Sequence, residues 1–253
     1  MKTLSNKQAM RYSRQILLPD FDLEKQEKLI NSSAIIIGLG GLGCSVSQYL
    51  CAAGIGKLTL VDDDTVELTN LQRQILHFEK DLGLSKVASA QDTLNHINSH
   101  TVVQTHIERL SENKLVELLK ENDILIDCSD NLSTRNSLNK LAYKSLTPLV
   151  SGAAIRMEGQ VFCVIPSESS SCYECLSRFF GEQNLSCNES GVMSPVVGTI
   201  GSMQATEAIK ILTQYGRPAV NILQVYDAME STWSRFNVTP FEACQVCGSK
   251  SVV

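Results

Sequence analysis

The stretch from residue 34 to residue 74 constrains the fold of this chain more than any other. It opens with an apolar run at residues 34–37, which predicts a buried strand, and the glycine-rich turn GLGGLG follows directly. Residues 44–53 have a helical pattern, and a second apolar run at residues 57–61 ends in three consecutive aspartates. The stretch therefore predicts a βαβ unit with the spacing G-x-G-x-x-G between its first strand and its helix.

The glycines of this turn point to a nucleotide. Because they lack side chains, Gly38, Gly40, Gly41 and Gly43 let the backbone turn tightly and approach a phosphate closely. The following helix offers unpaired N–H groups and a positive dipole end. Asp62, 19 residues beyond Gly43, ends the second strand, where a carboxylate can accept hydrogen bonds from ribose hydroxyls. The motif alone favours NAD over ATP, and a glycine-rich turn without a ligand is the alternative.

Polar and cationic residues beyond the three aspartates change the nucleotide that we expect. Asn70, Arg73 and Gln74 follow, and Lys86 stands near the start of the next predicted helix. A dehydrogenase has no need of two cations just beyond its ribose-binding acid. A site that cleaves a triphosphate does need them, because negative charge builds up on the phosphate oxygens. The alternative is that Arg73 and Lys86 are solvated surface charges.

The composition argues against several other classes of protein. The net charge is −5, whereas a general nucleic-acid binder is usually basic. No apolar run approaches the roughly 18 residues that a membrane-spanning helix needs, and the N-terminus lacks the apolar core of a signal peptide. With 253 residues the chain is long enough for a sizeable core. We therefore expect a cytoplasmic protein that binds neither nucleic acid nor membrane.

Beyond residue 83, predicted helices and strands alternate, which is typical of a mostly parallel sheet with helices on both faces. Helical patterns span residues 83–98, 111–121, 134–144 and 195–212, and strands are predicted at residues 102–107, near 123–131, 148–151, 160–165 and 221–226. Residues 7–31 predict one or two short helices. The Ser- and Cys-rich residues 166–194 predict a long loop, mobile over residues 181–190, of a kind that is often functional.

Two further groups of polar residues are candidates for the site. The predicted strand near residues 123–131 ends in polar residues, and doubly wound sheets bind ligands at such carboxyl ends. Asp130 is therefore a candidate acid for a metal ion or for the phosphate side, with a helix-capping role as the alternative. Arg11 and Arg14 are spaced to share a helix face, and surface charge is their simpler explanation.

The nine cysteines fall into three groups. Cys44, Cys51, Cys128 and Cys163 belong to apolar patterns and are expected to be small core residues. The pairs Cys172-x-x-Cys175 and Cys244-x-x-Cys247 suit a tetrahedral zinc site of four thiolates, which leaves no open position for catalysis; a redox dithiol is the alternative. Cys187 is unpaired in a polar segment without a nearby histidine, so it is either an inert thiol or a nucleophile.

Taken together, these residues resemble the MoeB/ThiF (HesA/MoeB/ThiF) family of adenylyltransferases, the bacterial relatives of ubiquitin-activating enzymes. The resemblance covers essentially the whole chain. Its motifs are RYSRQILLPDF from Arg11, GLGGLG, VDDDTVELTNLQRQ, SKV from Ser85, DCSDN, SGAAIRMEGQ from Ser151, CYECL, GVMSPVVGTIGSMQATEAIK from Gly191, YDAM and CQVCG. SGAAIRMEGQ, CLSRFFGE and YDAM are more similar to the molybdopterin-synthase-activating branch than to the thiamine branch.

The resemblance implies a fold and a reaction. It implies a Rossmann-like, doubly wound, mostly parallel sheet with a zinc-clipped C-terminal extension, in one domain of three parts: a helical lead-in (1–31), a nucleotide-binding core (32–165) and a zinc-bearing, carrier-docking part (166–253). Such enzymes bind ATP with Mg²⁺ and a small ubiquitin-like sulfur carrier that ends in Gly-Gly. They join AMP to the terminal carboxylate of the carrier, release pyrophosphate, and leave an acyl adenylate for sulfur transfer in molybdenum cofactor biosynthesis. The family also implies a homodimer with one carrier on each subunit.

The family's functional residues match positions of this chain. Lys86 matches the lysine that stabilises the charge shed to pyrophosphate, Asp130 the acid that holds magnesium, and Arg14 an arginine that reaches the ATP of the partner subunit. Cys187 matches a loop cysteine that links covalently to the carrier in some relatives. The expected ATP-binding residues are Gly38, Gly40, Gly41, Gly43, Asp62, Asp64, Asn70, Arg73, Gln74, Lys86, Asp130 and Asn131.

Two other functions stay open from the residues alone. An NAD-dependent oxidoreductase would share the glycine turn and Asp62, but it leaves Arg73, Lys86, Asp130 and the cysteine pairs unexplained. A zinc-stabilised module that docks a carrier without activating it would bind the carrier and release no pyrophosphate.

Overall fold

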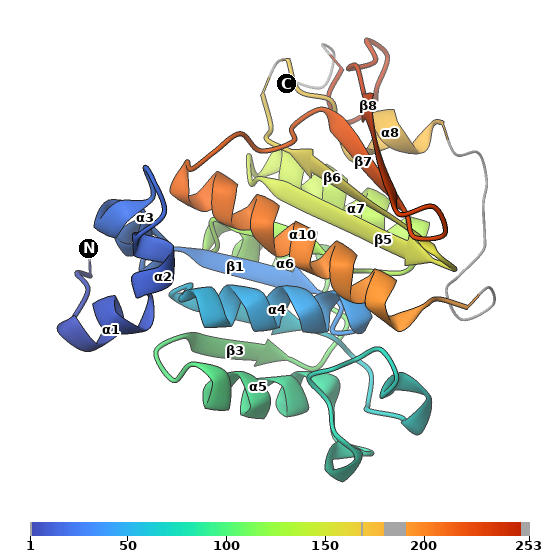
Figure 1. Ribbon diagram of the computed structural model, residues 1–253. Helices are drawn as coiled ribbons and strands as arrows, with labels where there is room; N and C mark the ends of the chain where they lie inside the picture. The colour runs from blue at the N-terminus through green and yellow to red at the C-terminus, as the bar shows by residue number, and fades with distance from the viewer. Residues whose placement is uncertain (1, 168, 180–190, 249–253) are drawn as a thin grey trace.

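The computed structural model describes residues 2–167, 169–179 and 191–248, and an eight-stranded sheet runs through them (Figure 1). Its strand order is β3-β2-β1-β4-β5-β6-β7-β8. The pairings from β3 to β5 are parallel, and those from β5 to β8 are antiparallel. The strands are β1 Ser33–Ile37, β2 Lys57–Val61, β3 Val102–His106, β4 Ile124–Asp127, β5 Leu149–Ile155, β6 Glu158–Val164, β7 Ile222–Asp227 and β8 Thr232–Asn237.

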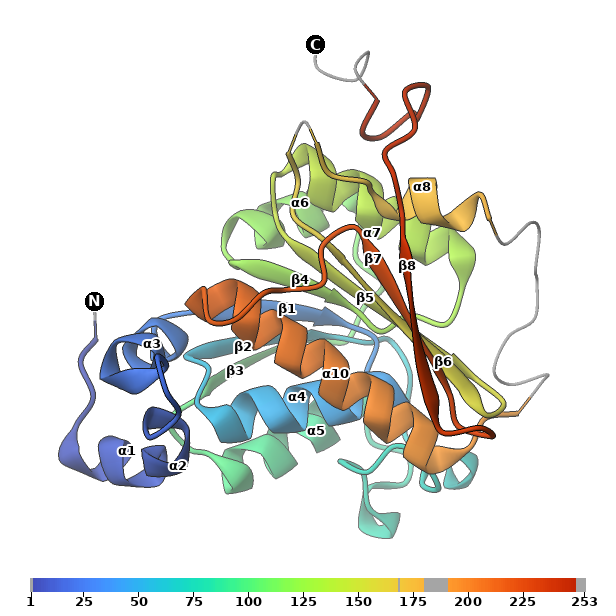
Figure 2. The same ribbon diagram turned by 45° about the horizontal axis from the view of Figure 1, so that its top comes forward.

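Side chains of β1 alternate between two cores, as the pleat of a strand requires. Ala34 and Ile36 belong to one apolar cluster and Ile35 to the other. The first cluster is covered by α4, α5 and α10, and the second by α6, α7 and α8 (Figures 1 and 2). The helices and 3-10 turns are α1 Asn6–Arg11, α2 Ser13–Ile16, α3 Asp22–Ile30, α4 Gly41–Ala53, η1 Leu68–Asn70, η2 Glu79–Asp81, α5 Lys86–Ile97, α6 Glu112–Lys120, α7 Leu132–Lys144, α8 Tyr173–Ser177 and α10 Ser194–Thr213.

This architecture confirms the predicted Rossmann-like α/β fold, and the structure corrects several details. Residues 7–31 form three short helices rather than one or two. The predicted loop at residues 166–194 contains α8, and the edge strand β8 was missed. Helix α4 begins at Gly41, within the glycine turn, and not at residue 44. The prediction that residues 181–190 are mobile falls outside the described residues.

The order of the strands places a crevice beside the glycine turn. From β1 the chain passes through α4 to β2 on one side, and β4 pairs with β1 on the other side. Connections that leave in opposite directions open a gap at the carboxyl ends of β1 and β4, which is where doubly wound sheets bind ligands. The helices α1, α2 and α3 lie at the opposite end of the parallel strands (Figure 1).

Gly43 allows the first turn of α4 to lie directly on the end of β1. A Cβ at this position would lie 1.9 Å from the carbonyl oxygen of Gly38, which is closer than any side chain tolerates. Gly38 itself has a φ of 93°, and a Cβ there would lie 2.9 Å from the carbonyl oxygen of Cys128 on the neighbouring strand end. Both positions therefore require glycine for packing as well as for any ligand.

We expect Gly43→Ala to lower the free energy of unfolding by at least about 2 kcal/mol, because the added methyl forces the backbone of α4 away from β1. Gly40→Ala is a matched control in the same turn. Its Cβ would meet only Gln74 Nε2, at 3.9 Å, so a loss below about 1 kcal/mol is expected from its N-cap position. Chemical denaturation compares the two variants, and equal losses of stability would contradict this packing role.

Candidate functional site

A cleft of about 780 Å³ opens at the carboxyl ends of the parallel strands. Its wall combines the glycine turn, the end of β2, the segment after η1, the start of α5 and the loop between β4 and α7. The predicted nucleotide-binding residues that line it are Gly38, Gly40, Gly41, Asp62, Asp64, Asn70, Arg73, Gln74, Lys86, Asp130 and Asn131. Gly43 does not line the cleft, because it packs against Gly38 instead.

Asp62 is tied to the glycine turn by its backbone contacts. Its Oδ2 accepts a hydrogen bond from the N–H of Leu39 at 2.6 Å, and its Oδ1 accepts one from the N–H of Asp64 at 2.9 Å. Burial raises the pKa of the Asp62 carboxyl, while the Leu39 N–H and the positive charge of Lys86 act in the opposite direction. The carboxylate is thus fixed at the mouth of the cleft, in the place expected for a ribose-binding acid.

Lys86 is a buried cation at the first turn of α5. Only 6% of its surface is exposed, and its Nζ lies 2.6 Å from Oδ2 of Asp64. Asp64 is largely exposed, so the ion pair borders the cleft rather than the core. Lys86 is therefore not the solvated surface charge that was the alternative for this residue.

The segment from Asn70 to Gln74 contributes further polar side chains to the wall of the cleft. Arg73 is half-buried, and its Nη1 donates a hydrogen bond to the carbonyl oxygen of Thr69 at 3.1 Å. Gln74 is buried, and among the described residues its Oε1 has no hydrogen-bond partner. An unpaired buried amide oxygen at a cleft wall suits a ligand that donates a hydrogen bond.

In the loop after β4, the structure distinguishes the residue that caps α7 from the residue that could bind a cation. Asn131 is the N-cap of α7, since its Oδ1 accepts a hydrogen bond from the N–H of Thr134 at 2.9 Å. Asp130 is exposed at the cleft and caps no helix; its Oδ1 lies 3.5 Å from Nδ2 of Asn131. The Asp130 carboxylate is therefore available to a cation in the cleft, and Asn131 has the capping role.

Several residues that line the cleft were missed in the sequence, among them Arg109 and Arg135. Arg135 is buried on α7, and its Nη2 and Nε donate hydrogen bonds to the carbonyl oxygen of Ser129 at 2.6 and 3.2 Å. The only signal for it was an arginine one turn beyond the N-cap Asn131. Its contact holds the loop that presents Asp130.

The roles of two predicted catalytic residues stay predictions. Arg14 lies on α2, at the far end of the parallel strands, and it does not line the cleft of its own chain (Figure 1). Cys187 lies outside the described residues. Nothing in the geometry of the cleft tests a role for either residue.

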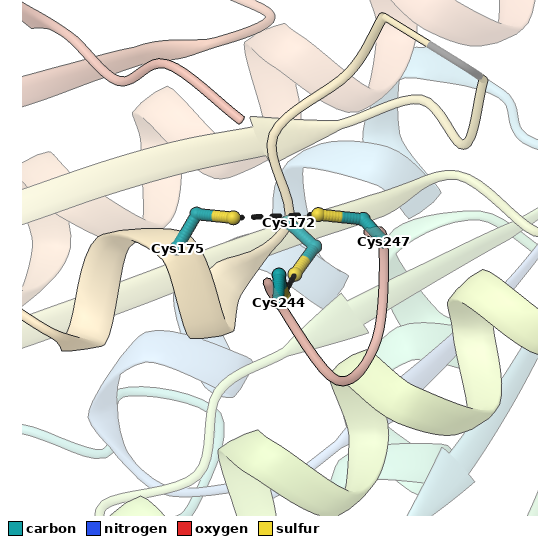
Figure 3. Close-up of side chains that lie close together, drawn as sticks. All are labelled: Cys172, Cys175, Cys244 and Cys247. Carbon is teal, nitrogen blue, oxygen red and sulfur yellow. Dashed lines mark hydrogen bonds between the residues drawn. The ribbon is translucent and has the colours of Figure 1, made fainter. Parts of the chain in front are cut away.

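The two cysteine pairs converge from segments far apart in the sequence (Figure 3). Their four sulfur atoms lie within 4.8 Å of one another, with Cys172 Sγ 3.6 Å from Cys244 Sγ and Cys175 Sγ 3.3 Å from Cys247 Sγ. These separations are too long for disulfides and suit four thiolates around one metal ion. The four cysteines that were predicted to be core residues are buried in the first apolar cluster, namely Cys44, Cys51, Cys128 and Cys163.

We expect Cys244→Ala to lose the bound metal ion and to unfold at a lower temperature than the wild-type chain, because three thiolates hold a tetrahedral ion weakly. Cys163→Ala is the matched control, since this cysteine is buried and lies outside the cluster. Elemental analysis of the purified variants and thermal unfolding measure the two effects. Equal metal content in both variants would contradict the assignment of the cluster.

The fold and the cleft together define a nucleotide-binding protein of the doubly wound α/β class. The chain belongs to the ThiF family, whose family model matches residues 12–246. Among the described residues, no helix is both long enough and apolar enough to span a membrane.

Similar proteins cover nearly the whole chain. It is 48% identical to the molybdopterin-synthase adenylyltransferase of Escherichia coli, over 98% of this chain and 100% of that protein. It is 38% identical to the sulfur carrier protein ThiS adenylyltransferase of the same species, over 98% of each chain. The solved structure of E. coli MccB with ATP superposes with a TM-score of 0.81, at 25% identity, over 97% of this chain and 75% of that one. These similarities confirm the family, the fold class and the adenylyltransferase activity predicted from the motifs.

Proposed function

We propose that this protein adenylates the C-terminal glycine of a small ubiquitin-like sulfur carrier, the small subunit of molybdopterin synthase, for molybdenum cofactor biosynthesis. The observation that supports it best is that the buried Lys86 and the half-buried Arg73 line the same cleft as Asp62 and the glycine turn. Two cations in one cleft with a ribose-binding acid suit a triphosphate better than a dinucleotide. The higher identity to the molybdopterin-branch relative than to the thiamine-branch relative favours the first carrier.

The reaction needs charge neutralisation more than acid–base catalysis. The terminal carboxylate of the carrier is already a nucleophile, and one of its oxygens attacks the α-phosphorus of ATP. A new C–O–P bond forms, the bond between the α-phosphorus and the bridging oxygen breaks, and pyrophosphate leaves with both electrons of that bond. Lys86 and Arg73 stabilise the charge that accumulates on the phosphate oxygens, while Asp62 orients the ribose.

Asp130 would hold Mg²⁺ at the cleft, since it is an exposed carboxylate without a capping role. When bound with ATP, the ion neutralises phosphate charge. The cysteine cluster would hold Zn²⁺, for which four sulfurs at about 2.3 Å from the metal stand about 3.8 Å apart. The separations of 3.3 and 3.6 Å in the cluster are close to that value.

The partners follow from the same proposal. The carrier docks on the zinc-bearing part, residues 166–253, and extends its Gly-Gly tail into the cleft. Arg14 lies too far from the cleft of its own chain to act there, so its proposed role requires a homodimer in which it reaches the ATP of the other subunit, with one carrier on each subunit. Cys187, which lies outside the described residues, remains a candidate for the covalent link to the carrier that the family resemblance implies.

We expect Arg73→Ala and Lys86→Ala each to lower the rate of ATP–pyrophosphate exchange by on the order of 10²–10³, by analogy with the loss of one oxyanion donor. Lys80→Ala is the matched control, because Lys80 is an exposed cation between them in sequence, and its rate is expected to stay at the wild-type value. Thermal unfolding confirms that each variant is folded. A rate within about threefold of wild type for either cleft variant would remove its assigned role.

Carrier choice is tested by the same exchange assay on metal-loaded wild-type protein, with a molybdopterin-type and a thiamine-type carrier added in turn. We expect exchange with the molybdopterin-type carrier and at most a trace with the other. Exchange with the thiamine-type carrier alone would move the protein to the other branch. Carrier binding without any exchange would favour a docking module.

A further inference from the structure

A buried amide next to the cysteine cluster has an N–H group without a partner. Asn139 lies in α7, and only 1% of its surface is exposed. Its Oδ1 accepts a hydrogen bond from the N–H of Tyr173 at 2.8 Å, so its Nδ2 is the atom on the other side of the amide. Among the described residues, this Nδ2 has no hydrogen-bond partner. A buried donor of this kind calls for an acceptor.

The sulfur of Cys172 is the acceptor that this amide can serve. Cys172 is fully buried and directly precedes Tyr173, the residue that Oδ1 of Asn139 holds. Burial raises the pKa of the Cys172 thiol, and the side chain of Asn139 acts in the opposite direction, so the amide lies close to the sulfur. A neutral thiol is only a weak acceptor, whereas a thiolate accepts a charge-assisted hydrogen bond.

The charge of a filled metal site gives such a donor a purpose. Four thiolates around a divalent ion carry more negative than positive charge, and three of the four cysteines are buried. Buried charge is unfavourable unless hydrogen bonds share it. The backbone supplies one donor, because the N–H of Val246 lies 3.4 Å from Sγ of Cys244. Asn139 offers a donor to Cys172, the least exposed of the four cysteines.

Contacts on both sides of Asn139 hold α7 against the segment that carries the first cysteine pair. Four residues before it, Nη1 of Arg135 lies 3.5 Å from Oη of Tyr173. Four residues after it, Oη of Tyr143 donates a hydrogen bond of 2.8 Å to the carbonyl oxygen of Ser167. Residues at this spacing share one face of a helix. The amide is therefore positioned by contacts that involve no cysteine sulfur.

We propose that Asn139 is a positioning residue for the metal ion, which donates an N–H···S hydrogen bond to the metal-bound thiolate of Cys172 while its Oδ1 holds the backbone of Tyr173. This inference rests on the proposed metal site and not on the reaction in the cleft. The two contacts fix the direction of the sulfur and stabilise its negative charge, as outer hydrogen bonds do for other metal ligands.

Two substitutions separate the donor of Asn139 from its acceptor. Asn139→Asp keeps an oxygen for the N–H of Tyr173 and replaces the N–H donor by a second oxygen, whereas Asn139→Ala removes both groups. We expect both variants to hold Zn²⁺ about tenfold more weakly than the wild-type chain, with the aspartate variant at least as weak as the alanine variant. Transfer of Zn²⁺ from the purified proteins to a chromophoric chelator measures the affinity.

The matched control is Asn136→Asp, the same substitution at an exposed position of α7, which is expected to hold Zn²⁺ as the wild type does. Protein loaded with Co²⁺ gives a second readout, the sulfur-to-cobalt charge-transfer absorption. We expect this band to move to lower energy in Asn139→Ala and to stay in place in Asn136→Asp, because a thiolate without its N–H donor gives up electrons more easily. If Asn139→Asp does not fold, the alanine variant and this band decide.

The outcomes separate this inference from a purely structural role and from the reaction. An aspartate variant that holds Zn²⁺ as tightly as wild type, with only the alanine variant weakened, would overturn the inference, since Asn139 would then only hold the backbone of Tyr173. An unchanged cobalt band in the alanine variant would also overturn it. Wild-type protein without bound metal would overturn the metal site and this inference together, whereas metal-loaded protein without ATP–pyrophosphate exchange would overturn the reaction alone.

Discussion

The backbone of α4 rests directly on the backbone at the end of β1, and the cleft depends on that contact. With no Cβ at Gly43, the first turn of the helix meets the Gly38 carbonyl without an intervening side chain. The same approach brings the unpaired N–H groups of this turn to the cleft, next to Gly40 and Gly41. Helix α10 packs along α4 and completes the first core (Figure 2). A shift of α4 would therefore disturb both the fold and the anion-binding end of the helix.

Lys86, a buried cation in the wall of the cleft, is paired with a carboxylate. An isolated ammonium with the low exposure of Lys86 would be strongly destabilising, and Asp64 prevents this at a distance of 2.6 Å. Asp64 is itself largely exposed, so this ion pair borders the cleft. Asp62 is held instead by two backbone N–H groups. Under the proposed function, the fixed acid orients the ribose and the exposed one gives up Lys86 to a phosphate.

Much of the fold and of the cleft could be predicted because the signals are local. The strand ends, the spacing of the glycines and the rule that parallel strands meet at one edge together predict a common site for Asp62, Lys86 and Asp130. Strand β8 could not be predicted, because all its residues are exposed and no apolar alternation marks it. The place of His77 behind the glycine turn was missed for a different reason. Its Nε2 lies 3.3 Å from the carbonyl oxygen of Leu39, 38 residues earlier in the chain, and no periodicity relates the two.

The exposure of β8 gives the C-terminal tail a physical reason to be anchored beyond the strand. Strand β8 is held by its hydrogen bonds to β7 and by the stacking of Trp233 on Tyr226, whose ring centroids lie 4.7 Å apart, and the tail beyond it is anchored separately. The tail returns to α8, where Phe241 lies against the guanidinium of Arg178 and the cysteine pairs meet. A cross-link between residues 72 apart removes on the order of 4 kcal/mol of chain entropy from the unfolded state in the simple loop-closure model. A metal ion held by the cluster would thus add to the apolar contacts that Val238 and Cys244 already make in the second cluster.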